Sequence, residues 1–166
     1  MTAELEHLVL FSDKIRDPSL KRFEQVPEGQ ENFRLLPDAM SMADLLVQLI
    51  QSDKVLFSIL KTKHIPENRG QPHMAKINER AEYDLLLHEF RQLKGMRHQF
   101  IVGLSEEPLQ TNITSKRMSG LTTMSLLEWL YGFLDHEIHH RGQLALYLSH
   151  LSISSLDFLR VFMSLW

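Results

Sequence analysis

One short segment in the last third of the chain concentrates residues that could do chemistry, Asp135-His-Glu-Ile-His-His-Arg-Gly-Gln143. His136 and His140 are four residues apart, so on a helix their imidazoles project from one face and can share a metal ion. His139 lies about 100° around the helix from His140 and is not expected to join the same site. Glu137 lies between the two faces and could accept a hydrogen bond from an imidazole or from water. The alternative is a structural pair of partly buried histidines that satisfy each other or backbone carbonyls.

The same segment matches the H-E-x-x-H pattern of zinc proteases, with His136 and His140 at its ends. Such enzymes need a third ligand further along the chain, and no Glu follows Glu137. Leu146 stands where the variant with three histidines would have its third. We therefore do not expect a protease.

Composition limits the chemistry that this segment could support. The chain has 166 residues, of which 43% are hydrophobic, 9 are His and none is Cys. Without Cys, a disulfide, a Cys-ligated zinc and a Cys nucleophile are excluded, so a metal ion would need nitrogen and oxygen donors. The net charge of −3, from 18 basic and 21 acidic residues, gives no basic footprint for nucleic acid.

Length and hydropathy predict a single cytoplasmic domain over residues 1–166 that makes no contact with a membrane. A second domain would leave both halves short of core. No stretch approaches the roughly 18–20 uninterrupted apolar residues that a membrane span needs. The first seven residues place acids before the apolar patch, which is the wrong charge order for a signal peptide.

Helical periodicity dominates the chain and predicts four long helices without a sheet, an all-α bundle. We expect these helices over about residues 3–26, with a break or kink at Asp17-Pro18, and then over 41–63, 74–103 and 122–151. Ser41 with Asp44, and Ser125 with Glu128, are spaced as helix N-terminal caps.

The rest of the chain is expected to connect these helices. Residues 27–40 and 64–72 are predicted loops, and residues 105–121 a connector with one short extended piece at 112–116. Residues 156–166 are predicted to form an apolar terminal helix, either a lid on its own bundle or a dimer contact.

The expected apolar stripes identify the faces that should meet in the core. On the helix over 41–63 the stripe comprises Leu45, Leu46, Leu49, Ile50, Leu56, Phe57 and Leu60. On the helix over 74–103 it comprises Ile77, Ala81, Leu85, Leu86, Phe90, Leu93, Phe100 and Ile101. Both sets recur at the spacing of one helical face.

The histidine segment, read with the residues that follow it, resembles the DinB/YfiT-like superfamily. The resemblance rests on His136-x-x-His139-His140-Arg141-Gly142-Gln143 with Tyr147-Leu148 beyond. Agreement in the first half is weaker and comprises Phe23 to Pro27, Asn32-Phe33-Arg34, Pro37, and Met40-Ser41 followed by Leu45-Leu46. Together these residues extend the resemblance over about 10–152.

The resemblance implies a DinB-like four-helix bundle, often a homodimer, with a divalent metal ion, usually nickel or zinc, held by three histidines. One ligand comes from the second helix and two come from the fourth. Characterised relatives include thiol-dependent S-transferases, and others are described as metal-dependent hydrolases. A member with such activity would act on a small molecule, with a low-molecular-weight thiol as a possible cosubstrate.

Carried over to this chain, the ligand set is incomplete. His136 and His140 match the two ligands of the fourth helix, whereas Gln48 occupies the position of the ligand from the second helix. No His occurs between His7 and His64, so a shift of register cannot supply it. Gln is a weak neutral oxygen donor, so the site should bind metal less tightly. Other candidate donors are Asp44, Asp53 and His88.

Two functions remain open at this point. In the first, the chain is a metal-dependent transferase or hydrolase with His136 and His140 as ligands, Gln48 as a ligand or orienting group, and Glu137 or Tyr131 as a proton carrier. In the second, it is a metal-free, non-catalytic bundle that acts as a dimer or partner-binding module.

Overall fold

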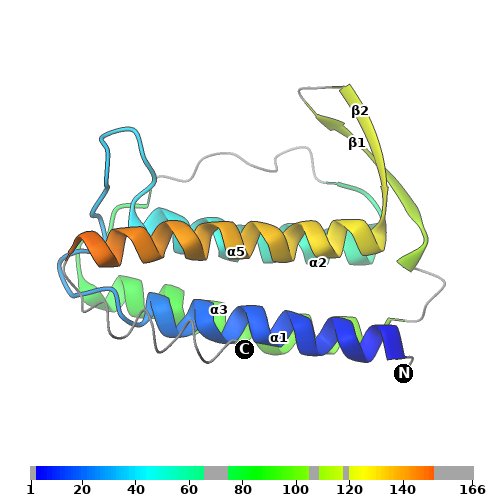
Figure 1. Cartoon of the computed structure of the whole chain (residues 1–166), viewed down its shortest axis with the longest axis horizontal. Helices are drawn as coiled ribbons and strands as arrows, with labels where there is room; N and C mark the ends of the chain where they lie inside the picture. The colour runs from blue at the N-terminus through cyan, green and yellow to red at the C-terminus, as the bar shows by residue number, and fades with distance from the viewer. Residues whose placement is uncertain (1–2, 66–74, 105–108, 118–119, 152–166) are drawn as a thin grey trace.

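The structure is a computed structural model that describes residues 3–65, 75–104, 109–117 and 120–151. Its elements are α1 (Ala3–Phe23), α2 (Met42–Thr62), α3 (Arg80–Val102), β1 (Asn112–Arg117), β2 (Gly120–Ser125) and α5 (Leu126–His150). Helices α1 and α2 each pack against both α3 and α5 (Figure 1). Because the start of α1 clusters with the ends of α2 and α3 and with the start of α5, α1 and α5 run opposite to α2 and α3. The expected all-α bundle is confirmed.

The two expected capping boxes fix the starts of the helices that carry the histidine pair and its neighbours. Ser41 caps α2, since its side chain accepts from the Asp44 backbone N–H while Asp44 accepts from the backbone of Ser41. Ser125 and Glu128 make the same reciprocal pair at the start of α5. Each box satisfies N–H groups that have no partner inside the helix.

Helix α1 does not break at Asp17-Pro18, which rules out the break but not the kink of the sequence-based expectation. It continues through Pro18 to Phe23. Proline removes one helical hydrogen bond, a local cost that tertiary contacts can offset. Here Arg16 and Leu20, on either side of Pro18, are both buried, and Ser19 donates from Oγ to the Ile15 carbonyl at 3.0 Å.

The connector before α5 contains a two-stranded antiparallel hairpin that the sequence analysis did not expect. The extended piece predicted at 112–116 is part of β1, and β2 pairs with it from Asn112 opposite Ser125 to Arg117 opposite Gly120. As a result α5 begins at Leu126, four residues after the expected start. The hairpin rises from one end of the bundle (Figure 1). The terminal helix predicted over 156–166 lies outside the described residues.

The buried face of α3 also differs from the expected stripe. Its core residues are Tyr83, Leu87, Phe90, Leu93, Arg97 and Ile101. Leu85, which was expected to be buried, is 69% exposed. The expectation was wrong because it counted only apolar residues, whereas the true face includes the charged side chain of Arg97. On α2 the expected stripe is buried except for Phe57, which is half-buried.

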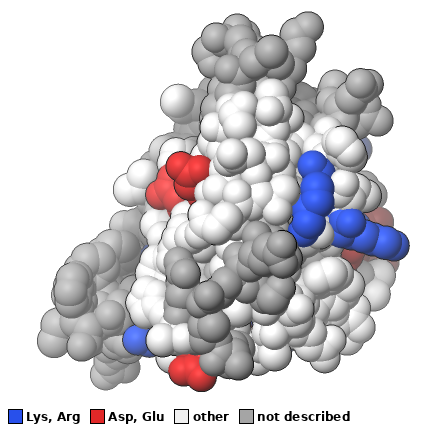
Figure 2. All heavy atoms as spheres, turned by 90° about the vertical axis from the view of Figure 1, so that its right-hand side faces the viewer, with Lys and Arg blue, Asp and Glu red and all other residues white. Residues whose placement is uncertain are grey.

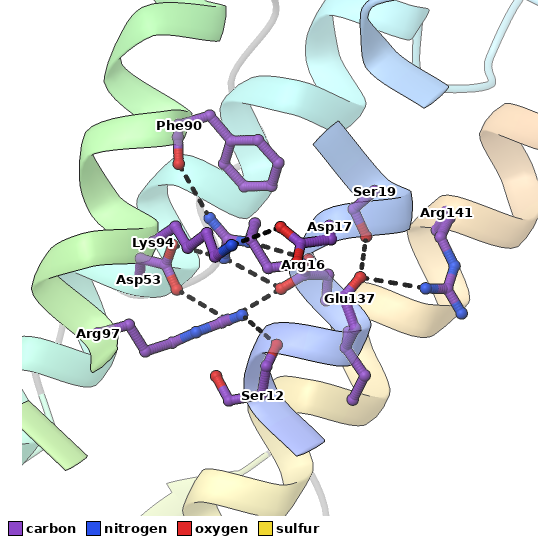
Figure 3. A network of polar contacts seen from close by, with 11 residues as sticks. Ser12, Arg16, Asp17, Ser19, Asp53, Phe90, Lys94, Arg97, Glu137 and Arg141 are labelled. Carbon is purple, nitrogen blue, oxygen red and sulfur yellow. Dashed lines mark hydrogen bonds and ion pairs between the residues drawn. The ribbon is translucent and has the colours of Figure 1, made fainter. Parts of the chain in front are cut away.

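The apolar core consists of two clusters, one towards each end of the bundle. One gathers around Phe23, Phe90 and Tyr147, and the other around Leu8, Leu56 and Trp129. Four buried charged residues, one from each helix, lie where the two clusters meet, and Figure 3 shows them together; they are Arg16, Asp53, Arg97 and Glu137.

These four residues form a charge network, the name used for them below. Arg16 donates to Asp53 Oδ2 at 2.7 Å and to Glu137 Oε1 at 2.9 Å. Arg97 donates to Glu137 Oε2 at 2.8 Å and lies 3.4 Å from Asp53 Oδ1. The Arg16 guanidinium also lies 3.8 Å from the centre of the Phe90 ring. Two positive and two negative charges therefore compensate each other across all four helices.

The network favours the charged form of Glu137, whereas at Asp53 burial outweighs the attraction of Arg16 and Arg97 and raises the pKa of that carboxyl group. Burial opposes the ionisation of Glu137, but Arg16 and Arg97 outweigh it and lower the pKa of this carboxyl group. Two further guanidinium N–H groups donate to backbone carbonyls, from Arg16 to Phe90 at 3.2 Å and from Arg97 to Ser12 at 3.3 Å. Such hydrogen bonds offset the cost of removing each ion from water.

Among the residues that the structure describes, few charged side chains are seen on the end of the molecule that carries the hairpin. Figure 2 shows a few of both signs among uncharged atoms on this face. Among the described helices, none is both long enough and apolar enough to cross a membrane.

Removing one charge from the network should destabilise the fold strongly. Asp53→Asn leaves two buried guanidinium groups facing a single carboxylate, so we expect the free energy of unfolding to fall by about 3–5 kcal/mol. Urea denaturation followed by circular dichroism measures the change. The matched control is Asp17→Asn, which breaks the exposed ion pair with Lys94 and should cost less than about 1 kcal/mol. Equal losses in the two variants would contradict a special role for the network.

Candidate functional site

The two histidines of the predicted pair meet on α5. Their Nε2 atoms face each other at 2.8 Å, and the ring centres are 4.3 Å apart with the planes tilted by 78°. His140 is buried and His136 is half-buried. The spacing of four residues therefore brings the imidazoles together as expected on one helical face.

The outer nitrogen of each ring is held by a neighbouring polar group. His140 Nδ1 lies 2.7 Å from Gln143 Oε1, one turn further along α5. His136 Nδ1 lies 3.0 Å from the hydroxyl of Ser52 on α2. Histidine ligands of metal ions characteristically have their second nitrogen held in this way.

Both imidazoles are neutral at pH 7. Burial lowers the pKa of His136, and the nearby His139 lowers it further. Burial lowers the pKa of His140 to about 4 against the opposing effect of the hydrogen bond to Gln143. Each neutral ring has one nitrogen with a free lone pair, which is the form that binds metal.

Gln48 lies on the same face of α2 as Ser52, one turn earlier. Its side chain is half-buried and has no hydrogen-bond partner among the residues that the structure describes. Within the described ranges, no group of three or more His, Cys, Asp or Glu side chains could hold a metal ion. The pair therefore offers two nitrogen donors that suit nickel or zinc, and the nearby side chains of α2 add only neutral oxygen donors.

The other expected donors have different partners. Asp44 closes the cap of α2, pairs with Arg34 at 2.8 Å and accepts from the Ala75 N–H. Asp53 belongs to the charge network. His88 is exposed on α3.

The two residues predicted to carry protons are not brought to the pair. Both Glu137 oxygens accept from Arg16 and Arg97 within the charge network. Tyr131 is 36% exposed, and its ring lies 6.3 Å from that of Phe11 on α1. Their proton-carrying roles stay predictions.

The remaining residues of the motif sit around the pair without completing it. His139 is exposed, with its ring centre 5.3 Å from that of His140. Arg141 donates to the Ile15 carbonyl of α1 at 3.1 Å. A Cβ added to Gly142 would meet no described atom within 4 Å, so packing inside the described chain does not require this glycine.

Sequence reasoning missed the residue of α2 that meets the pair. Ser52 lies four residues after Gln48 on the same face of α2, so the face was identified but this contact was not, and the role of Gln48 stays a prediction. The available signal was the N-terminal cap at Ser41, which fixes where α2 starts, combined with the apolar stripe that fixes its rotation. Neither signal gives the axial offset between α2 and α5, which the charge network sets.

Comparison with known proteins agrees with this architecture. A family model described as the DinB superfamily matches residues 13–144. A DinB-like protein from Bacillus subtilis superposes with a TM-score of 0.68 at 16% sequence identity, covering 90% of this chain and 94% of that one. A conserved protein from Enterococcus faecalis gives 0.68 at 15% identity, covering 92% and 98%. No curated protein matches the sequence.

The low pKa of His140 predicts that the fold weakens as the pH falls towards 5. The unfolded chain takes up a proton on this side chain near its ordinary pKa of about 6.5, whereas the folded chain resists it until about pH 4. The free energy of unfolding should therefore decrease between about pH 6.5 and 5, and the slope should flatten in His140→Gln. Urea denaturation at several pH values measures this slope, and identical slopes in both proteins would contradict the assignment.

Proposed function

The chain belongs to the DinB superfamily, and on that premise we propose that it binds a divalent metal ion through the Nε2 atoms of His136 and His140. The ion would serve a transferase or hydrolase reaction on a small molecule. The observation that carries the proposal is the pair itself, two neutral imidazoles facing each other at 2.8 Å with both outer nitrogens held.

The donor set favours nickel or zinc. Imidazole nitrogens suit these borderline ions, and the chain has no Cys that would offer a softer ligand. Gln48 replaces the third histidine that the family resemblance implies, so a bound ion would keep more open positions and a lower affinity. Open positions leave room for water or substrate.

Each neighbour of the pair has a definable task. Gln143 accepts from His140 Nδ1 and so directs the lone pair of Nε2 towards His136. When bound, a divalent ion lowers the pKa of a coordinated water or thiol and so supplies a nucleophile at neutral pH. Because the chain contains no Cys, a thiol-transfer reaction would need a thiol cosubstrate from solution.

A second candidate is a metal-free bundle without catalysis. It is favoured by the same contacts, since Ser52, His136, His140 and Gln143 satisfy one another without an ion. In this case the pair would link α2 to α5 as a structural hydrogen-bonded chain. Homodimerisation, which either candidate permits, is a separate expectation that light scattering would test.

Loss of either histidine should abolish metal binding. We expect untagged wild-type protein to retain about one equivalent of Ni²⁺ or Zn²⁺ after equilibrium dialysis, and His136→Ala and His140→Ala to retain only background. Elemental analysis by mass spectrometry gives the stoichiometry. His139→Ala is the matched control, because it removes an exposed histidine from the same helix and should leave binding unchanged. Background metal in the wild type would instead favour the metal-free bundle.

Restoring the third ligand should strengthen the site. Gln48→His places an imidazole on the face of α2 that contacts α5, so we expect Zn²⁺ affinity to rise at least about tenfold, or about 1.4 kcal/mol. Competition with a chromophoric chelator measures the affinity. Gln51→His, on a neighbouring face of the same helix, is the control that adds a histidine without this placement. Equal gains in both variants would contradict the proposed geometry.

A further inference from the structure

We propose that the Ser52 hydroxyl sets the tautomer of His136 and thereby switches the histidine pair between a closed, hydrogen-bonded state and a state that accepts a metal ion. The geometry is the direct contact of Ser52 Oγ with His136 Nδ1 at 3.0 Å, across the interface of α2 and α5. The inference rests on the proposed function for its metal-accepting state. Its closed state stands on the metal-free chain alone.

The closed state follows from counting protons along the four groups. His140 carries its proton on Nδ1 and donates to Gln143 Oε1, so its Nε2 is an acceptor. The 2.8 Å contact between the two Nε2 atoms then requires the proton of His136 to be on Nε2. His136 Nδ1 is left as an acceptor, and Ser52 donates to it.

The metal-accepting state needs one proton to move. Both Nε2 lone pairs must face the ion, so His136 loses the proton on Nε2 and gains one on Nδ1. The exchange passes through water, and the imidazole stays neutral with no net release of protons. In this state Nδ1–H donates to Ser52, whose hydroxyl rotates from donor to acceptor.

A hydroxyl is the group that can serve both states. It has one rotating O–H donor and two lone pairs, so Ser52 can satisfy His136 Nδ1 in either tautomer. The carbonyl oxygen of Gln143 can only accept, which keeps His140 in a single tautomer. The two ends of the hydrogen-bonded series from Ser52 to Gln143 therefore differ. The tautomer of His140 is fixed, whereas that of His136 can switch.

Substitutions of Ser52 separate these roles. Ser52→Asp supplies only acceptors, so His136 should adopt the Nδ1–H tautomer even without metal, and Zn²⁺ affinity should rise about tenfold. Ser52→Ala supplies neither a donor nor an acceptor, so metal-free His136 should keep its proton on Nε2. Zn²⁺ affinity should fall about 10–100-fold, the range typical when a metal ligand loses its hydrogen-bond partner. Ser52→Thr keeps the hydroxyl and should match the wild type.

The experiment records two-bond ¹H–¹⁵N correlation spectra of ¹⁵N-labelled, untagged full-length chain at pH 7.5, which distinguish Nδ1–H from Nε2–H histidines. Spectra of His136→Gln assign the signals, and chelator competition gives the Zn²⁺ affinity of each variant. Ser58→Ala is the control, a half-buried serine of α2 that makes no described contact with the pair. If Ser52→Asp fails to fold, the comparison of Ser52→Ala with Ser52→Thr carries the test through affinity.

The outcomes distinguish this inference from the proposed function. An Nε2–H tautomer of His136 in the metal-free wild type that becomes Nδ1–H in Ser52→Asp supports the inference. A metal-free wild type already in the Nδ1–H form, or equal Zn²⁺ affinities in Ser52→Ala and Ser52→Thr, would overturn it. A wild type that binds no Zn²⁺ would overturn the proposed function, while the metal-free spectra would still decide whether Ser52 sets the tautomer.

Discussion

The buried charge network is the constraint on which the rest of the bundle depends. Hydrophobic contact is non-directional, so an apolar side chain can accept many partners, but each charged group of the network has partners at fixed positions on other helices. Arg16 on α1 must meet Asp53 and Glu137, and Arg97 on α3 must meet the same two carboxylates. The network therefore constrains the axial offset and rotation of all four helices.

The histidine site is built on residues adjacent to this network. Ser52 precedes Asp53 on α2, and His136 precedes Glu137 on α5. Successive residues of a helix are rotated by about 100°, so turning Asp53 and Glu137 into the core turns their neighbours towards the interface between α2 and α5. The 3.0 Å contact of Ser52 with His136 follows from that placement. The residues that fix the fold thus also position the candidate chemistry.

The sequence predicts those features that depend on local patterns. The capping boxes at Ser41 and Ser125, the apolar stripe of α2 and the pairing of His136 with His140 all follow from spacing along one helix. The features that the sequence did not predict correctly depend on tertiary contacts; they are the absence of a break in α1 at Pro18 and the buried face of α3. A charged residue at a stripe position, such as Arg97 between Leu93 and Ile101, indicates a buried ion pair, but its partners come from other helices.

The location of the stabilising contacts bears on how a metal ion could act here. In a small metal-dependent domain the ion supplies folding energy, and removing it unfolds the chain. In this bundle the charge network and two apolar clusters join the helices, and His136 and His140 satisfy each other through Nε2. An ion would replace that one hydrogen bond without changing the helix contacts. Binding and release can then occur in a folded chain, as an exchangeable catalytic ion requires.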